Sequence, residues 1–184
     1  KSLIGPTTKL RWSYAASKMI DEFIALSLYE EKKVSPIIVR LFNIIGPNQL
    51  SKFGMVVPKF IEAAINDEDI LIHGDGSQSR SFTWVDDVVT YLIKLAELKA
   101  YGEIFNIGQT EEITIKELAE LIIEKSNSNS KIIYKSHEEV FGKSFEDPNR
   151  RTPGIEKIVE FTGIKPSKNI EFMVENIINY KQNN

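Results

Sequence analysis

The sequence contains no cysteine and only two histidines, His73 and His137, in its 184 residues. Without cysteine there can be no disulfide, no thiol nucleophile and no cysteine-ligated metal ion. The two histidines lie far apart, and no suitably spaced carboxylates accompany either of them. We therefore predict that the chain has no metal site.

The sequence also lacks long apolar runs and any strong excess of one charge. No stretch approaches the roughly 18 apolar residues of a membrane-spanning helix, and no signal peptide begins the chain. We therefore expect a cytoplasmic protein without a membrane partner. The 23 Lys and Arg are nearly balanced by 26 Asp and Glu, for a net charge of -3. Because these charges form no basic stripe, we expect no nucleic-acid partner.

A glycine-rich dinucleotide loop is missing as well. The nearest match, Gly74-Asp75-Gly76, would need a further glycine at Ser79 and a long helix beginning there, and it has neither. We interpret this stretch as a hairpin or bend.

What the sequence does contain is an alternation of amphipathic segments and short apolar runs. Apolar residues at helical spacing and β-branched runs predict helices and parallel strands in turn, which is typical of an α/β protein. Thr114 and Glu117 form a capping box, and Asp86 and Asp87 are expected to cap the helix that they begin. The core should contain Phe23, Phe42, Phe60 and Phe105. Helices are predicted at 12–32, 57–66, 86–99, 115–125, 154–162 and 169–182, and strands at 37–42, 70–73, 104–108 and 131–134.

Tyr14 and Lys18 are the first candidate pair for chemistry. They lie four positions apart in the first predicted helix, so they share a face and are separated by about 6 Å along the axis. An ammonium beside a phenol favours the phenolate, which can act as a base. Taken alone, the pair fits an exposed helical turn equally well.

Arginines form a second candidate group. Arg80 follows the glycine turn, and Arg150 and Arg151 lie in a loop between Pro148 and Pro153. The planar guanidinium fork suits a diphosphate, and prolines reduce the entropy that a loop loses on binding an anion. The alternative is that these arginines are solvated surface charges.

Two further polar residues follow predicted strands. Asn43, after the strand 37–42, can bind a ligand or satisfy its own turn. His73 ends the strand 70–73, where its ring can stack on a base or serve the structure alone. The loops after Phe42 and after Ile107 lie at the carboxyl ends of strands, where open α/β sheets bind ligands.

Eight segments along the chain resemble, in order, motifs of the extended short-chain dehydrogenase/reductase family. The nucleotide-sugar epimerases, dehydratases and decarboxylases are the most similar members. The resemblance covers nearly all 184 residues. The segments are Gly5-Pro6-Thr7-Thr8-Lys9 with Arg11-Trp12-Ser13-Tyr14-Ala15-Ala16-Ser17-Lys18, Arg40-Leu41-Phe42-Asn43 with Gly46-Pro47, Gly54-Met55-Val56-Val57-Pro58, Gly74-Asp75-Gly76-Ser77-Gln78-Ser79-Arg80, Phe105-Asn106-Ile107-Gly108 and Arg150-Arg151-Thr152-Pro153.

The resemblance implies the C-terminal part of a doubly wound parallel (Rossmann-type) sheet plus a smaller α/β substrate-binding domain. Residues 1–47 and 81–108 would form the partial Rossmann-type layer. Residues 48–80 and 109–184 would form the nucleotide-sugar-binding domain. The family's glycine-rich NAD-binding half has no counterpart in these 184 residues. We therefore expect part of a longer enzyme, inactive and a weak NAD binder by itself, with an open sheet edge.

The resemblance also implies roles around the cofactor NAD. Tyr14 would take the proton of a sugar hydroxyl while hydride passes to NAD. Lys18 would bind the nicotinamide ribose, and Phe42 would lie near the nicotinamide.

The remaining implied roles concern a nucleotide-diphosphate sugar, most simply a UDP-sugar. Asn43 would lie near the sugar diphosphate, and the backbone at Val56 with the ring of His73 would hold the base. Arg80 would grip the diphosphate together with a second arginine, either Arg151 or Arg150.

The implied activity is 4-epimerisation of a UDP-sugar through a 4-keto intermediate. Nucleotide-sugar 4,6-dehydration and UDP-glucuronate decarboxylation are the alternatives within the family. A non-catalytic nucleotide-binding or interaction domain is the alternative outside it. The resemblance also implies a homodimer that packs through the helix bearing Tyr14. Two positions depart from the family pattern: Asn48, where relatives often have arginine, and Gly154, where they often have aspartate.

Overall fold

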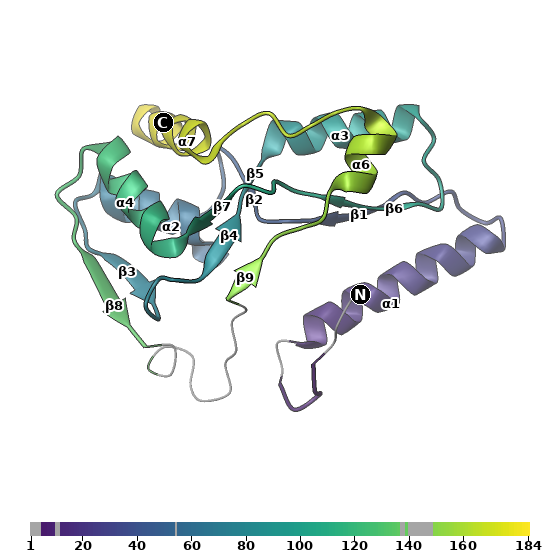
Figure 1. Cartoon of the computed structure of the whole chain (residues 1–184), viewed down its shortest axis with the longest axis horizontal. Coiled ribbons are helices and arrows are strands. Elements are labelled where there is room, and N and C mark those ends of the chain that lie inside the picture. Colours follow the sequence, from purple (N-terminus) through teal and green to yellow (C-terminus); the bar gives the residue numbers. More distant parts are fainter. Residues whose placement is uncertain (1–4, 10–11, 54, 137–138, 140–148) are drawn as a thin grey trace.

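The chain folds into an α/β structure with two hydrophobic cores, joined by short strands (Figure 1). A computed structural model describes residues 5–9, 12–53, 55–136, 139 and 149–184. Four residues named above, Arg11, Gly54, His137 and Pro148, lie outside the described residues.

The first core surrounds two parallel strands, β1 (Ile38–Leu41) and β6 (Ile104–Ile107), which were both predicted. Helices α3 (Val85–Glu97) and α6 (Glu156–Thr162) contribute the helical side of this core. Phe105 and Tyr91 are its largest fully buried side chains. The Tyr91 hydroxyl donates to the carbonyl of Ile164, 3.0 Å away, and so joins α3 to the segment after α6.

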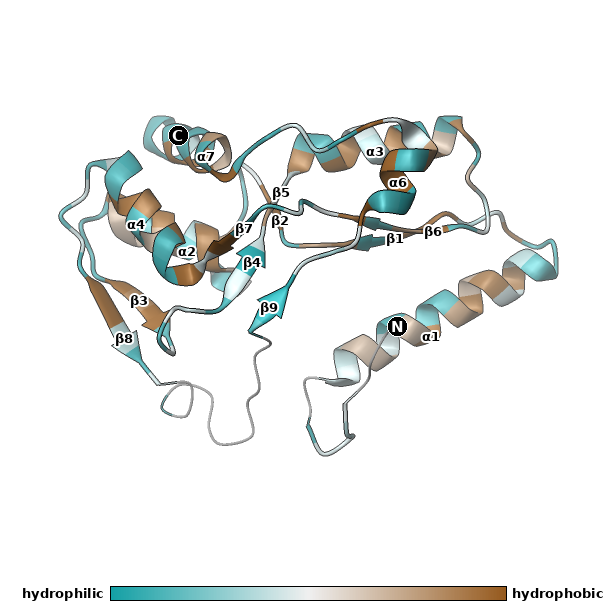
Figure 2. Ribbon diagram, in the orientation of Figure 1, coloured by the Kyte–Doolittle hydropathy of each residue, from teal (hydrophilic) through white to brown (hydrophobic). Residues whose placement is uncertain are grey.

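The second core packs three helices over the parallel strands β3 (Ile70–His73) and β8 (Ile132–Lys135). The helices are α2 (Val56–Ile65), α4 (Ile115–Ser126) and α7 (Ile170–Asn183). Figure 2 shows their hydrophobic residues among hydrophilic ones, as amphipathic helices require. All five elements were predicted within a residue or two at each end.

Short strands between the two cores escaped the sequence analysis. β7 (Glu112–Thr114), β4 (Ser79–Ser81) and β9 (Arg150–Arg151) form one three-stranded sheet, with β4 in the centre. A further parallel pair consists of β2 (Ile44–Ile45) and β5 (Thr83–Trp84), and a 3-10 turn, η1, spans Ser51–Phe53. Elements of two or three residues are too short to show a hydrophobic period.

Helix α1 (Trp12–Glu30) has the predicted boundaries but not the predicted burial. None of its residues is buried, and Phe23 is 64 % exposed, so its assignment to the core was wrong. In Figure 1 the helix lies on the opposite side of β1 and β6 from α3. Glu22 ties it to β1: the carboxylate accepts two hydrogen bonds of 2.6 Å each from the Arg40 guanidinium.

Strand β1 is also less buried than its apolar sequence predicted. Among the described residues it pairs with β6 alone, and Leu41 at its end is 45 % exposed. The open edge agrees with the expectation from the resemblance.

Local signals in the sequence gave mixed results. The capping box of Thr114 and Glu117 is confirmed, with both reciprocal hydrogen bonds present. The expected caps at Asp86 and Asp87 are wrong: Trp84 is the N-cap residue of α3, without a side-chain cap. Asp86 accepts from the Trp84 indole and Asp87 from Ser167 instead. These partners outcompete the first-turn N–H groups.

The glycine turn is confirmed as a bend. Gly74 and Gly76 have φ of 81° and 78°, values that favour glycine, and the strands on either side belong to different sheets.

The fold class is therefore as predicted, with parallel strands and helices in the Rossmann-type arrangement. The proposed division at residues 47, 81 and 108 remains a prediction. Helix α6 falls in the second of the two proposed parts, but it shares a hydrophobic core with β6 and α3. In the part of the chain that is described, no helix has the length and apolarity to cross a membrane.

Candidate functional site

Phe42 and Asn43 follow the carboxyl end of β1, and hydrogen bonds connect them to β4 and β5. The Asn43 side-chain amide donates to the carbonyl of Ser81 at 2.8 Å, next to Arg80 in the chain. Thr83 of β5 holds the same two residues, because its hydroxyl donates to the Phe42 carbonyl and its N–H donates to the Asn43 carbonyl. With a φ of 41°, Asn43 is in the left-handed region that asparagine tolerates better than most residues.

Arg80 and Arg151 lie on one face of the three-stranded sheet. They are register partners on the parallel strands β4 and β9, and paired residues direct their side chains to the same face. Arg80 also donates to the carbonyl of Ser79 at 2.7 Å. Two guanidinium groups side by side form a site for a doubly charged anion.

Arg151 connects this pair to the end of β1. Its guanidinium carbon lies 5.9 Å from the centroid of the Phe42 ring. Close packing at Gly108 brings the strand ends together: a Cβ there would lie 2.3 Å from Pro153 and 3.2 Å from Phe42. The structure thus joins Phe42, Asn43, Arg80 and Arg151 in one place.

Arg150 faces the other way. It precedes Arg151 in an extended strand, so the two side chains alternate across the sheet. Its guanidinium meets the Glu112 carboxylate in a salt bridge of 2.6 Å, with Nε 2.7 Å from Oε1. The Arg150 guanidinium, with help from the Ser79 hydroxyl, lowers the pKa of Glu112 to about 2. Arg150 thus already has a carboxylate partner on this face of the sheet.

Tyr14 and Lys18 share a face of α1, as the spacing predicted. The Lys18 Nζ lies 6.0 Å from the Tyr14 ring centroid, and the phenol is 68 % exposed. Asp21 accepts a hydrogen bond of 2.8 Å from Lys18 and raises the pKa of that amine, so the ammonium stays charged. Within residues 5–9, 12–53, 55–136, 139 and 149–184, the structure records no contact between this pair and the arginines.

Val56 and His73 lie on two other elements, α2 and β3. Val56 is the first residue of α2, where backbone N–H groups lack helical partners. His73 ends β3 opposite Lys135 of β8, half-buried.

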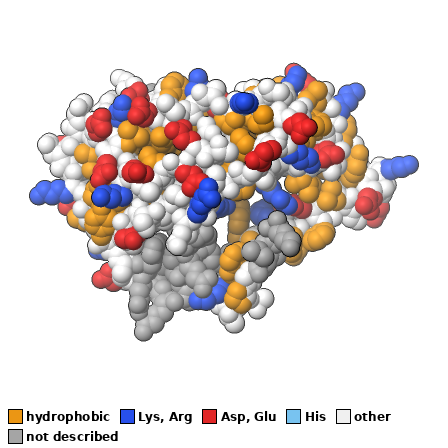
Figure 3. Space-filling view, viewed as in Figure 1, with side chains coloured by type: hydrophobic (Ala, Val, Ile, Leu, Met, Phe, Trp, Pro, Cys, Tyr) orange, Lys and Arg blue, Asp and Glu red, His pale blue; other side chains and the backbone are white. Residues whose placement is uncertain are grey.

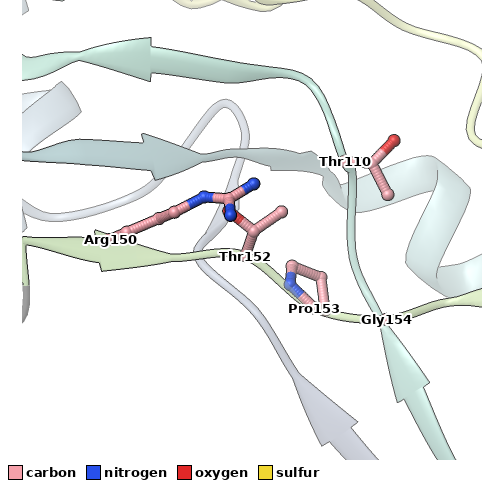
Figure 4. A pocket seen from close by; sticks show the side chains of 5 residues that line it. All are labelled: Thr110, Arg150, Thr152, Pro153 and Gly154. Carbon is pink, nitrogen blue, oxygen red and sulfur yellow. The ribbon is translucent and has the colours of Figure 1, made fainter.

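A hollow of about 390 Å³ opens beside the end of β9 (Figure 4). Arg150 is the one predicted site residue in its lining, and Tyr14, Arg80 and Arg151 do not line it. Its walls are formed by Thr110, Arg150, Thr152, Pro153 and Gly154.

Comparison with known families agrees with this arrangement. Residues 1–108 match the model of the NAD dependent epimerase/dehydratase family. The chain belongs to this family. The match covers Tyr14, Lys18, Phe42, Asn43 and Arg80, whereas β9 with its two arginines lies beyond it.

Among curated relatives of this epimerase/dehydratase chain are two decarboxylases. The UDP-N-acetyl-alpha-D-glucosaminuronate decarboxylase of Bacillus cytotoxicus is 39% identical over 166 residues, covering 90% of this chain and 51% of the relative. UDP-glucuronic acid decarboxylase 4 of Arabidopsis thaliana is 34% identical over 157 residues, covering 85% of this chain and 34% of the relative. The chain thus spans about half of the first relative and a third of the second.

Among solved structures, the UDP-glucose 4-epimerase of Thermotoga maritima in complex with UDP-glucose is similar throughout. The TM-score is 0.82 and the identity 27%, over 92% of this chain and 53% of the epimerase. Membership of the family and the likeness to these Rossmann-type structures confirm the resemblance inferred from the motifs.

The sequence analysis missed Glu112. It lies in a three-residue strand just before the capping box, and no periodicity marks it. Only pairing with β4 shows that it reaches Arg150 and Ser79.

Proposed function

We propose that this chain supplies the substrate half and the catalytic Tyr–Lys pair of an NAD-dependent enzyme that acts on a UDP-sugar. The observation that carries the proposal is the convergence of Arg80 and Arg151 with Phe42 and Asn43, the two residues that follow the carboxyl end of β1. Paired guanidiniums suit a diphosphate, and this edge of an α/β sheet is where ligands bind.

In this proposal Arg80 and Arg151 grip the diphosphate from one face of the sheet. The backbone at Val56, the first residue of α2, and the half-buried His73 with its ring hold the base. Asn43 lies beside the sugar diphosphate and, through its hydrogen bond to the Ser81 carbonyl, holds the end of β1 against β4.

The described residues fit one end of NAD. Tyr14 and Lys18 expose a phenol and a charged ammonium on one helical face, suited to the two hydroxyls of a ribose. Phe42 is the aromatic residue proposed beside the nicotinamide. When bound, NAD accepts the hydride from the sugar C4. The 184 residues contain no glycine-rich loop for its diphosphate, so that contact must come from elsewhere in the enzyme.

Tyr14 is the proposed base for the C4 hydroxyl. As hydride leaves C4, the hydroxyl proton passes to the phenolate oxygen and the C–O bond becomes a ketone. Lys18, held charged by Asp21, stabilises the negative phenolate electrostatically.

Decarboxylation of a UDP-uronic acid is the outcome that we propose first. A ketone at C4 is β to the carboxylate on C5, so the bond between C5 and the carboxyl carbon can break: CO2 leaves, and the electron pair of that bond forms an enolate. C5 then takes up a proton, and return of the hydride to C4 gives a UDP-pentose. The higher identity to decarboxylases, 39% and 34%, supports this order. The 4-epimerisation expected first from the motifs becomes the second candidate, supported by a 4-epimerase structure at 27% identity.

The test uses the full-length enzyme with NAD and three substrates: UDP-glucuronate, UDP-N-acetylglucosaminuronate and UDP-glucose. We expect CO2 and a UDP-pentose-type product from one of the uronates. Conversion of UDP-glucose to its C4 epimer, without CO2 from either uronate, would establish the second candidate. Binding of UDP without any turnover would indicate a non-catalytic nucleotide-binding domain.

A further inference from the structure

We propose that Glu112 is a positioning residue that fixes the register of strand β9 and so selects Arg151, not Arg150, for the diphosphate. The proposal rests on the function above, since it names what holds the proposed arginine pair in place. No motif in the sequence marks Glu112, and it does not itself face Arg80 or Arg151.

The Glu112 carboxylate reaches across the whole three-stranded sheet. It starts on β7, accepts from the Ser79 hydroxyl of central β4 at 2.8 Å, and accepts from Arg150 Nε of β9 at 2.7 Å. A second guanidinium nitrogen lies 2.6 Å from Oε1, so Arg150 presents two donors. One side chain thereby connects all three strands on the face opposite Arg80 and Arg151.

Strand β9 needs such a connection because it is very short. It has two residues, and at its start the Ser79 N–H donates to the Asn149 carbonyl at 2.8 Å. Its two residues are both arginine, so a slip of one position would turn Arg150 toward Arg80 and Arg151 to the opposite face. The sequence of β9 alone does not distinguish these registers, because both place an arginine on each face.

Electrostatics removes this ambiguity. In the observed register the Glu112 carboxylate neutralises Arg150, while Arg151 lies above the Phe42 ring. A slip of one position would break both observed contacts, because each arginine would move to the opposite face and about 3.3 Å along the strand. The ion pair and the ring therefore favour the same register from the two faces of the sheet.

The experiment measures the affinities of UDP and of uridine by calorimetry. The variants are Glu112→Gln, Arg150→Gln and the double variant. Glu103→Gln is the matched control, because Glu103 forms a 2.7 Å ion pair with Lys157 outside this sheet. We expect each single variant to lose about 10- to 100-fold in UDP affinity, the scale of one charged hydrogen-bond partner. Uridine affinity should change less than about twofold, since uridine has no phosphate.

The double variant decides how Arg150 acts. If Arg150 acts through Glu112, the double variant binds UDP no more weakly than either single variant. An additional loss in the double variant would make Arg150 a direct phosphate ligand and overturn the proposal. So would unchanged UDP affinity in Glu112→Gln, or equal losses for UDP and uridine.

Hydrogen exchange at the Arg151 amide gives a second readout. It should quicken in Glu112→Gln and stay unchanged in Glu103→Gln. Exchange unaltered in Glu112→Gln would also overturn the proposal. If the unaltered chain binds UDP no more tightly than uridine, the proposed diphosphate site itself fails, which is a different result from a failure of Glu112 alone.

Discussion

Arg80 and Arg151 are register partners on the parallel strands β4 and β9, although they lie far apart in the sequence. Arg80 follows the glycine bend, and Arg151 shortly precedes helix α6. Their shared face meets the end of β1 at Phe42, whose ring lies under the Arg151 guanidinium. These two cations beside a strand end are the anion site that we propose, and each part of it can be tested.

Replacing Arg80 by alanine should weaken UDP binding by roughly 1–3 kcal/mol, the scale of a lost charged hydrogen-bond partner. Calorimetric titration with UDP measures the change. Lys94→Ala in α3 is the control, because Lys94 pairs with Glu97 of the same helix. Equal affinities of wild type and Arg80→Ala would remove Arg80 from the diphosphate site.

Replacing Tyr14 by phenylalanine in the full-length enzyme should lower turnover by about 10²- to 10⁴-fold, the usual contribution of a general base. UDP affinity should stay the same, because the phenol hydroxyl meets the sugar and not the diphosphate. Tyr29→Phe is the matched control, since Tyr29 is another exposed tyrosine of α1. A Tyr14→Phe enzyme with full turnover would end its assignment as the base.

The stabilising effect of Glu112 should disappear in acid. Its pKa in the folded chain, about 2, lies below the ordinary value of 4.5, so the folded chain binds fewer protons than the unfolded chain between these values. The contribution is therefore complete above about pH 4.5 and is lost as the pH falls toward 2.

Urea unfolding of wild type and Glu112→Gln at several pH values between about 7 and 3 measures this contribution. The difference in free energy of unfolding should shrink below pH 4.5. In an Arg150→Ala background it should be smaller throughout, because Arg150 is the main cause of the low pKa. A difference that does not vary with pH would contradict the assignment.

Exposed apolar side chains on α1 predict self-association. Met19, Ile20, Phe23 and Ile24 are exposed on one helix, and apolar side chains reach the surface in this part of the molecule (Figure 3). Phe23→Asp should therefore shift the chain toward monomer in sedimentation experiments, while Lys33→Asp beyond the helix should not. If wild type and Phe23→Asp sediment alike as monomers, the predicted homodimer through this helix is wrong.

Long periodic segments were predictable because their folding is governed locally. The helices α2, α4 and α7 and the strands β3 and β6 follow from hydrophobic spacing, and the capping box of Thr114 and Glu117 marks where α4 begins. The burial of α1 was not predictable, since a hydrophobic period shows which face is apolar but not what covers it. The caps expected at Asp86 and Asp87 also failed, because these carboxylates bind the Trp84 indole and the Ser167 hydroxyl, which local capping rules do not consider.

The sequence by itself determined the α/β class, the family, and which residue types carry the chemistry: a tyrosine and lysine on one helical face, and three arginines. Only the tertiary structure shows that Arg151 and Arg150 lie on opposite faces of the sheet. The two are adjacent and chemically identical, so no pattern in the chain separates them. Pairing with β4 does, because strand register sends neighbouring side chains to opposite faces, where Glu112 meets Arg150 and Phe42 meets Arg151.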